Sequence, residues 1–137
     1  MLYATCCILA SMAEKITRFG DLVVWQKAHQ IVLQVYRITG SFPAEERFGL
    51  TSQMRRAAVS VPANLAEGFK KRGVRDKLNF YNIAQGSLEE LRYYLILSKD
   101  LGYMPESREM VEATEEIARM LHGLVKSVAE GVKEPSR

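Results

Sequence analysis

Apolar residues recur every three or four positions along four stretches of this 137-residue chain. In the first stretch the spacings are 4, 3, 4 and 3, through Val24, Ala28, Ile31, Val35 and Ile38. An α-helix turns once every ~3.6 residues, so this spacing places all five side chains on one helix face. No stretch shows the period-two alternation of a half-buried strand. The chain is therefore predicted to be all-α.

The first predicted helix follows Asp21, its expected N-cap, and ends before Gly40 and Pro43. A second stripe runs beside the core stripe and comprises Leu22, Trp25, His29, Val32, Tyr36 and Thr39. Two adjoining stripes make an apolar face that is wide enough to pack against two neighbouring helices.

The second helix has its core stripe at Leu50, Met54, Ala57, Val61 and Leu65. Gly49 interrupts the chain before this stripe, and Gly68 and Gly73 bracket its end. Pro62 lies inside the helix and lacks a backbone donor, so we expect a kink there.

The third helix is predicted from about Arg75 to Leu101, with Gly102 as its C-terminal cap. Gly86 lies in its middle, where close backbone packing is expected to offset a cost of roughly 1 kcal/mol relative to alanine. Pro105 is expected to open the fourth helix. Because short turns join these helices, the predicted fold is an antiparallel up-down-up-down four-helix bundle.

The two ends of the chain are expected to lie outside the bundle. The apolar segment Met1–Ser11 has no basic residue before it and is shorter than the ~20 residues of a membrane span. Met12 is an alternative start. We expect a poorly ordered leader over residues 1–18, the bundle over 19–131 and a frayed tail over 132–137. Adjacent Cys6 and Cys7 form no structural disulfide, which fits a cytoplasmic protein.

Catalytic and metal chemistry has little support in the sequence. Di-iron bundles use Glu-x-x-His pairs, but Gln26 precedes His29 and Arg119 precedes His122 at that spacing. No glycine-rich phosphate loop follows a strand. We therefore expect no enzyme activity, no metal and no cofactor, with both histidines packed or solvated.

Positive charge is concentrated in one segment. The whole chain has 19 Lys and Arg against 16 Asp and Glu, a net charge of +3. Residues 55–77 contain two acidic residues and seven basic ones, namely Arg55, Arg56, Lys70, Lys71, Arg72, Arg75 and Lys77. Such a cluster predicts contacts with nucleic-acid phosphates, for which Arg56 and Lys71 are the strongest candidates. The alternative is a solvated turn.

Aromatic residues are scarce in this segment, because only Phe69 and Phe80 lie close to the basic residues in sequence. We therefore expect phosphate contacts without base stacking or base reading.

The second helix also has an apolar outer face. At about 100° per residue, Val59, Ala63 and Ala66 fall opposite the core stripe. Small side chains allow another helix to approach closely, so these three residues predict a subunit interface. The alternative is simple exposure of a few apolar residues, which is common.

Four segments carry a resemblance to a known family: FGDLVVWQKA, FPAEERFGLTSQMRRAAVSVPANLAEG, FYNIAQGSLEEL and LGY. They begin at Phe19, Phe42, Phe80 and Leu101, and the match extends to about Leu124. The chain resembles the four-helix bundle proteins encoded by intervening sequences within bacterial 23S ribosomal RNA genes, which are often called S23 ribosomal proteins. The "ribosomal" label reflects gene location.

The resemblance implies an antiparallel four-helix bundle, a ring-shaped homopentamer in relatives, and no enzyme. A related branch is the accessory protein of diversity-generating retroelements, which is considered to bind RNA and a reverse transcriptase. The leading hypothesis is thus an oligomeric protein that binds RNA or DNA, with a reverse transcriptase as a further partner if the gene lies in a retroelement. A protein-interaction scaffold is the alternative, and no membrane partner is expected.

Overall fold

The computed structural model describes residues 15–131, which contain four α-helices, two 3-10 turns and no strand. In chain order the elements are η1 (Phe19–Asp21), α2 (Val23–Thr39), η2 (Ala44–Glu46), α3 (Leu50–Lys70), α4 (Val74–Asp100) and α5 (Arg108–Ala129). The all-α prediction is confirmed for this part of the chain.

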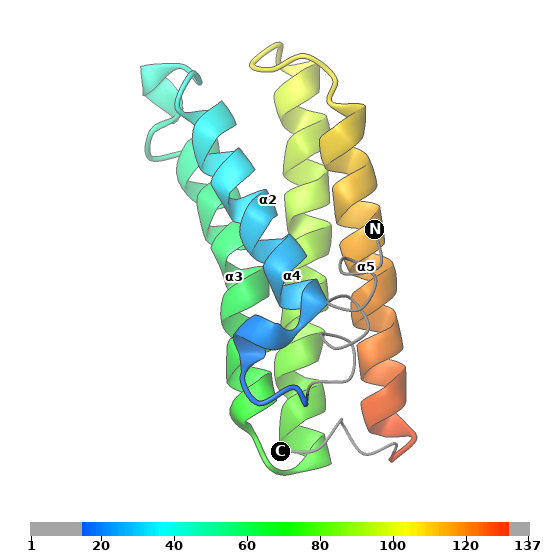
Figure 1. The fold of residues 1–137 in the computed structure, drawn as a ribbon. Helices are drawn as coiled ribbons and strands as arrows, with labels where there is room; N and C mark the ends of the chain where they lie inside the picture. The colour runs from blue at the N-terminus through cyan, green and yellow to red at the C-terminus, as the bar shows by residue number, and fades with distance from the viewer. Residues whose placement is uncertain (1–14, 132–137) are drawn as a thin grey trace, which may run out of the picture.

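The helices form a single antiparallel bundle. Figure 1 shows α2 rising, α3 descending, α4 rising and α5 descending. Both α2 and α4 contact α3 and α5, and the most extensive contact joins α3 to α4. The predicted four-helix bundle is therefore confirmed, and the α3–α4 turn lies at the lower end of the molecule in this view.

The core stripes predicted for the helices α2 and α3 face the centre of the bundle. All five residues of the α3 stripe are buried. In α2 the first four residues of the stripe are buried, while Ile38 is partly buried against the core. Burial of a large apolar side chain contributes about 1.5–3 kcal/mol, so these stripes account for much of the drive to fold.

Two helix starts differ from prediction. Leu22, not Asp21, is the N-cap of α2, because the Asp21 carboxylate already accepts hydrogen bonds from the Thr17 and Arg18 amides. The last helix, α5, begins at Arg108 instead of near Pro105. Its N-cap Ser107 accepts a hydrogen bond of 3.2 Å from the Met110 amide, which a proline side chain cannot do.

The start of α3 agrees with the expected interruption at Gly49, which is the N-cap. A 3-10 turn precedes it, and Glu46 Oε2 accepts a hydrogen bond of 3.1 Å from the Leu50 amide. Further along, the helix continues through the buried Pro62 to Lys70. The kink at that proline stays a prediction.

Close backbone packing occurs at a different glycine from the one expected. A Cβ added to Gly86 would meet no atom within 4 Å, so the expectation of tight packing there is wrong. At Gly68 an added Cβ would lie 2.6 Å from Tyr81 Cε1, because the buried Tyr81 ring packs against the α3 backbone. Gly102 has a φ of 77° and ends α4 as predicted.

Most of the predicted leader and all of the predicted tail lie outside the described residues, as do both cysteines. Within residues 15–131, none of the helices combines the length and the hydropathy needed to cross a membrane.

Candidate functional site

The seven candidate basic residues do not form one cluster in space. Arg55 and Arg56 lie in the first half of α3, whereas the other five lie at the end of α3 and the start of α4. Fourteen residues separate Arg56 from Lys70, which is roughly 21 Å along a helix at 1.5 Å per residue. The sequence segment therefore supplies two positive regions, one beside α2 and one at the end of the bundle.

Lys77 is removed from the phosphate-binding candidates by its burial. The residue is 3% exposed, and its ammonium donates hydrogen bonds to the carbonyls of Gly68 at 3.2 Å and Phe69 at 2.9 Å. These carbonyls belong to the last turn of α3, where backbone acceptors lack helical partners and a positive charge is favourable. Lys77 therefore caps α3, and its inclusion in the candidate site was wrong.

The remaining four basic residues form what we call the basic turn: Lys70, Lys71, Arg72 and Arg75. Lys70, Arg72 and Arg75 are exposed, and Lys71 is half-buried. The Lys71 ammonium lies 5.1 Å from the centre of the Phe80 ring, which holds it by a cation–π contact. Phe69 is similarly engaged by the Lys77 ammonium at 5.6 Å. Both aromatic rings near the basic turn thus have a cation as a neighbour.

Arg55 is held in place by α2. Its Nε donates a hydrogen bond of 2.9 Å to Thr39 Oγ1, and an Nη2 contact of 3.5 Å reaches the Tyr36 carbonyl. The guanidinium carbon lies 4.6 Å from the centre of the Tyr36 ring. Among residues 15–131 no carboxylate forms an ion pair with Arg55, so its positive charge is not neutralised.

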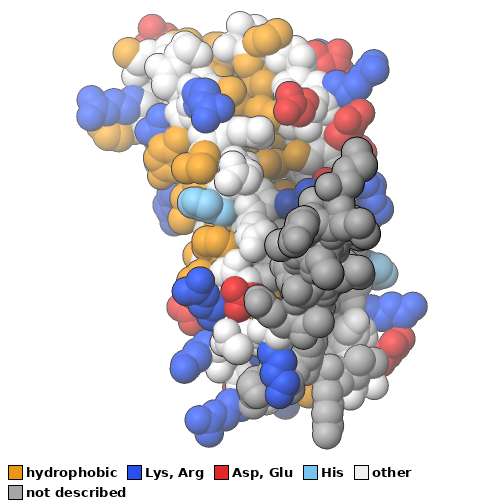
Figure 2. Space-filling model, viewed as in Figure 1, with side chains coloured by type: hydrophobic (Ala, Val, Ile, Leu, Met, Phe, Trp, Pro, Cys, Tyr) orange, Lys and Arg blue, Asp and Glu red, His pale blue; other side chains and the backbone are white. Residues whose placement is uncertain are grey.

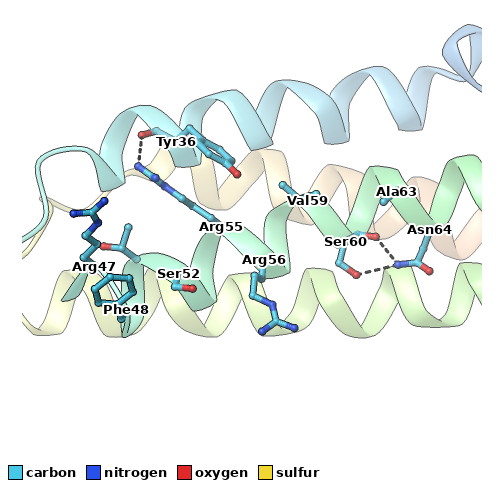
Figure 3. A pocket seen from close by; sticks show the side chains of 11 residues that line it. Tyr36, Arg47, Phe48, Ser52, Arg55, Arg56, Val59, Ser60, Ala63 and Asn64 are labelled. Carbon is cyan, nitrogen blue, oxygen red and sulfur yellow. Dashed lines mark hydrogen bonds between the residues drawn. The ribbon is translucent and has the colours of Figure 1, made fainter.

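Arg55 lies in a surface groove of about 670 Å³ between α2 and the first half of α3. We call this the arginine groove; its lining residues are Tyr36, Arg47, Phe48, Thr51, Ser52, Arg55, Arg56, Val59, Ser60, Ala63 and Asn64. Figure 3 shows Arg55 reaching toward Tyr36, with Arg56 pointing away from α2 and Phe48 near the start of α3. Phe48 is 88% exposed, and the Arg47 guanidinium lies 5.5 Å from its ring centre.

A second, smaller groove continues the first along α3. This apolar groove has a volume of about 290 Å³ and is lined by Phe19, Trp25, His29, Val32, Val59, Pro62, Ala63 and Ala66. Val59 and Ala63 line both grooves. Figure 2 shows hydrophobic side chains along the side formed by α2 and α3, with Lys and Arg above and below them.

The three predicted interface residues all line this apolar groove. Val59 is 40% exposed, Ala63 is exposed and Ala66 is half-buried. The Trp25 ring stacks on His29 with ring centres 5.2 Å apart, which gives that histidine a packed position as expected. The outward direction of the three side chains agrees with the helical phase, and the subunit interface itself stays a prediction.

Comparison with known proteins identifies the family. A family model described as "23S rRNA-intervening sequence protein" matches residues 20–123. The chain belongs to this family. A crystal structure of a protein of unknown function, from the S23 ribosomal protein family of Bacteroides thetaiotaomicron, shares the fold with a TM-score of 0.66. That protein is 24% identical, and the match covers 76% of this chain and 99% of the other. No curated protein matches.

In this member of the 23S rRNA-intervening sequence protein family, sequence reasoning overlooked two aromatic residues of the arginine groove. Tyr36 was assigned only to the second apolar stripe of its helix, and Phe48 received no role. A signal was present at Phe48, because an aromatic residue between Arg47 and Gly49 in a turn has no helix face in which to bury. Tyr36 meets Arg55 across 19 residues, and no local pattern encodes that contact.

The described part of this family member contains no group of three His, Cys, Asp or Glu side chains that could hold a metal ion. His122 is exposed on α5, on a different helix from His29.

Proposed function

We propose that this protein is a non-enzymatic homo-oligomer that binds RNA through electrostatic contacts with phosphates. The observation that carries the proposal is the basic turn, where Lys70, Lys71, Arg72 and Arg75 meet at one end of the bundle. Within residues 55–77, only Glu67 and Asp76 carry negative charge. Family membership fits this role, and the proposal places the protein in the cytoplasm.

Oligomerisation would multiply a weak interaction. The apolar groove is the proposed contact between copies, and a homopentamer is the assembly that the family resemblance implies. Five basic turns on one particle would raise the affinity for a strand that spans several of them, by about 10² or more, through effective concentration alone. Contacts to phosphates would not select a sequence.

Binding to a 30-nucleotide RNA across a salt series tests the proposal. Each phosphate contact of a single strand contributes about 0.7 to the slope of log affinity against log salt. Replacing Lys70, Lys71 and Arg72 by alanine should lower the slope by up to about 2 per subunit engaged. The matched control replaces Lys99, Arg108 and Arg119, which are exposed on α4 and α5 and remove the same charge.

No binding at low salt would overturn the proposal. An equal loss of slope in both triple variants would also contradict it, because net charge and not the basic turn would then explain the binding.

A protein-interaction scaffold is the second candidate, and the apolar groove is the observation that favours it. Under this proposal the basic turn is only solvated, and the partner is another protein. Two results together would favour it. Partner proteins would co-purify after nuclease treatment and a high-salt wash, and the protein would not bind RNA at low salt. A reverse-transcriptase gene beside this one would identify that enzyme as the first partner to test.

A further inference from the structure

Phe48 is the most exposed large apolar side chain in the described part of the chain, at 88%. It lies in the turn between η2 and α3, beside Arg47, on the wall of the arginine groove. We propose that the arginine groove binds single-stranded nucleic acid, with a base stacked on Phe48 and the phosphates held by Arg47, Arg55 and Arg56. This inference rests on the proposed function and names the strand form and the site that it uses.

The groove combines the two features that single strands require. Proteins that bind single strands without sequence preference pair a positive groove with aromatic rings on which bases stack. Here three arginines and two aromatic residues, Tyr36 and Phe48, line one groove. Its volume of about 670 Å³ lies within the range of roughly 300–1,000 Å³ typical of small-ligand sites.

Arg55 and Tyr36 form a prepared platform within the groove. Thr39 Oγ1 donates a hydrogen bond of 2.7 Å to the Val35 carbonyl and accepts one from Arg55 Nε, so the guanidinium is positioned before any ligand arrives. A guanidinium plane stacks on bases as an aromatic ring does, and its remaining N–H groups suit a phosphate. Because Arg55 is already held, its side chain would lose little conformational freedom on binding.

The rest of the lining contains no carboxylate and combines the polar residues Thr51, Ser52, Ser60 and Asn64 with the apolar residues Val59 and Ala63. Asn64 Nδ2 donates to the Ser60 carbonyl at 2.8 Å and to Ser60 Oγ at 2.9 Å, as Figure 3 shows. Asn64 and Ser52 both line the groove, so the Asn64 amide oxygen and the Ser52 hydroxyl add hydrogen-bonding groups to it. A polyanion therefore meets positive charge and hydrogen-bonding groups without a repelling negative charge.

The two grooves favour different occupants. A second copy of this chain would bury the apolar groove with little desolvation of polar groups. In the arginine groove it would have to neutralise three arginines that have no ion pair among residues 15–131. Phosphates neutralise them directly, while bases cover the exposed ring of Phe48. A duplex offers its phosphates but keeps its bases stacked inside, so single strands should bind more tightly.

Fluorescence anisotropy of the full-length protein with labelled 12-nucleotide probes tests the inference. The probes are oligoadenosine as RNA and as DNA, an abasic strand with the same phosphates, and a 12-base-pair duplex. Since stacking contributes about 1–3 kcal/mol per base, one stacked base should make the base-bearing strands bind about fivefold to 150-fold more tightly than the abasic strand. Comparison of the RNA and DNA probes shows whether the 2′-hydroxyl contributes.

Phe48→Ala should remove most of the preference for bases over the abasic strand, and Phe48→Trp should retain it. Phe48→Leu is the matched control, because it keeps an apolar side chain without an aromatic face. Since Phe48 is almost fully exposed, none of these changes should alter the stability of the bundle. Arg56→Ala should weaken binding of the abasic and base-bearing strands by the same factor.

Three results would overturn the inference while leaving the proposed function intact. The first is equal affinity for the abasic and base-bearing strands. The second is a preference that persists in Phe48→Ala. A change in oligomeric mass in Phe48→Ala, without any change in binding, would assign the groove to contacts between proteins and would also overturn it. Absence of binding by every probe at low salt would contradict the proposed function as well.

Discussion

The basic turn and the arginine groove carry similar charge in very different surroundings. In the basic turn the charges lie at the bundle end, on side chains that are mostly exposed. In the arginine groove Arg55 is fixed by Thr39 and Tyr36, and an apolar groove adjoins it. Charge alone attracts a polyanion, whereas fixed charge beside aromatic rings provides a shaped site.

The largest expected effect concerns the apolar groove, which adjoins the arginine groove. Ala63→Glu places a carboxylate in the apolar groove, so it should reduce the mass measured by light scattering from that of the oligomer toward 15.5 kDa. Helical content should not change, because Ala63 is exposed. Ala129→Glu, an exposed change on α5, serves as the control and should leave the mass unchanged.

A native chain that is monomeric at micromolar concentration would remove the oligomer from the proposal. An unchanged mass in Ala63→Glu would place the contact between copies elsewhere.

The next prediction concerns the packing of Tyr81 against α3 at Gly68, close to the basic turn. Gly68→Ala should destabilise the protein by about 1–3 kcal/mol in urea unfolding, since its Cβ would meet the Tyr81 ring at 2.6 Å. Gly86→Ala is the matched control and should stabilise it by about 0.5–1 kcal/mol, because nothing lies within 4 Å and alanine favours a helix. Equal effects at the two sites would contradict the packing described here.

Two substitutions that remove the same charge distinguish a buried lysine from an exposed one. Lys77→Met should cost about 1–2 kcal/mol of stability, because two α3 carbonyls lose a donor, while the salt slope of RNA binding stays the same. Lys70→Met removes the same charge from an exposed site, so stability should change by less than about 0.5 kcal/mol and the slope should fall. The reverse pattern would show that Lys77 contacts phosphates.

The smallest effect lies at η1, beside the apolar groove. The hydrogen bond from the Thr17 amide, aided by the one from Arg18, holds the pKa of Asp21 below its usual value of 3.8. A lowered pKa in the folded state stabilises the protein above pH 3.8, and this contribution disappears as pH falls through the folded value. Asp21→Asn should therefore lower Tm slightly at pH 7. A difference in Tm that does not shrink as the pH falls below 3.8 would contradict this assignment.

Periodicity in the sequence predicts the four helices, the core stripes of α2 and α3, and the outward direction of Val59, Ala63 and Ala66. These features depend on the 3.6-residue repeat, which is local, so residues a few positions apart carry all the information needed. The bundle follows from four such helices and short connections. Among the predicted helix boundaries, the starts at Asp21 and Pro105 are wrong, because single hydrogen bonds decide such a boundary.

Which basic side chains are accessible to a ligand depends on contacts between helices. Lys70 and Lys77 read alike in the sequence, but only Lys77 reaches the carbonyls of Gly68 and Phe69 and is buried. Tyr36 joins Arg55 because α2 and α3 pack side by side. Gly68, not Gly86, has a ring against its backbone. Each outcome depends on which residue a second helix presents, and this information is absent from the periodicity of the first.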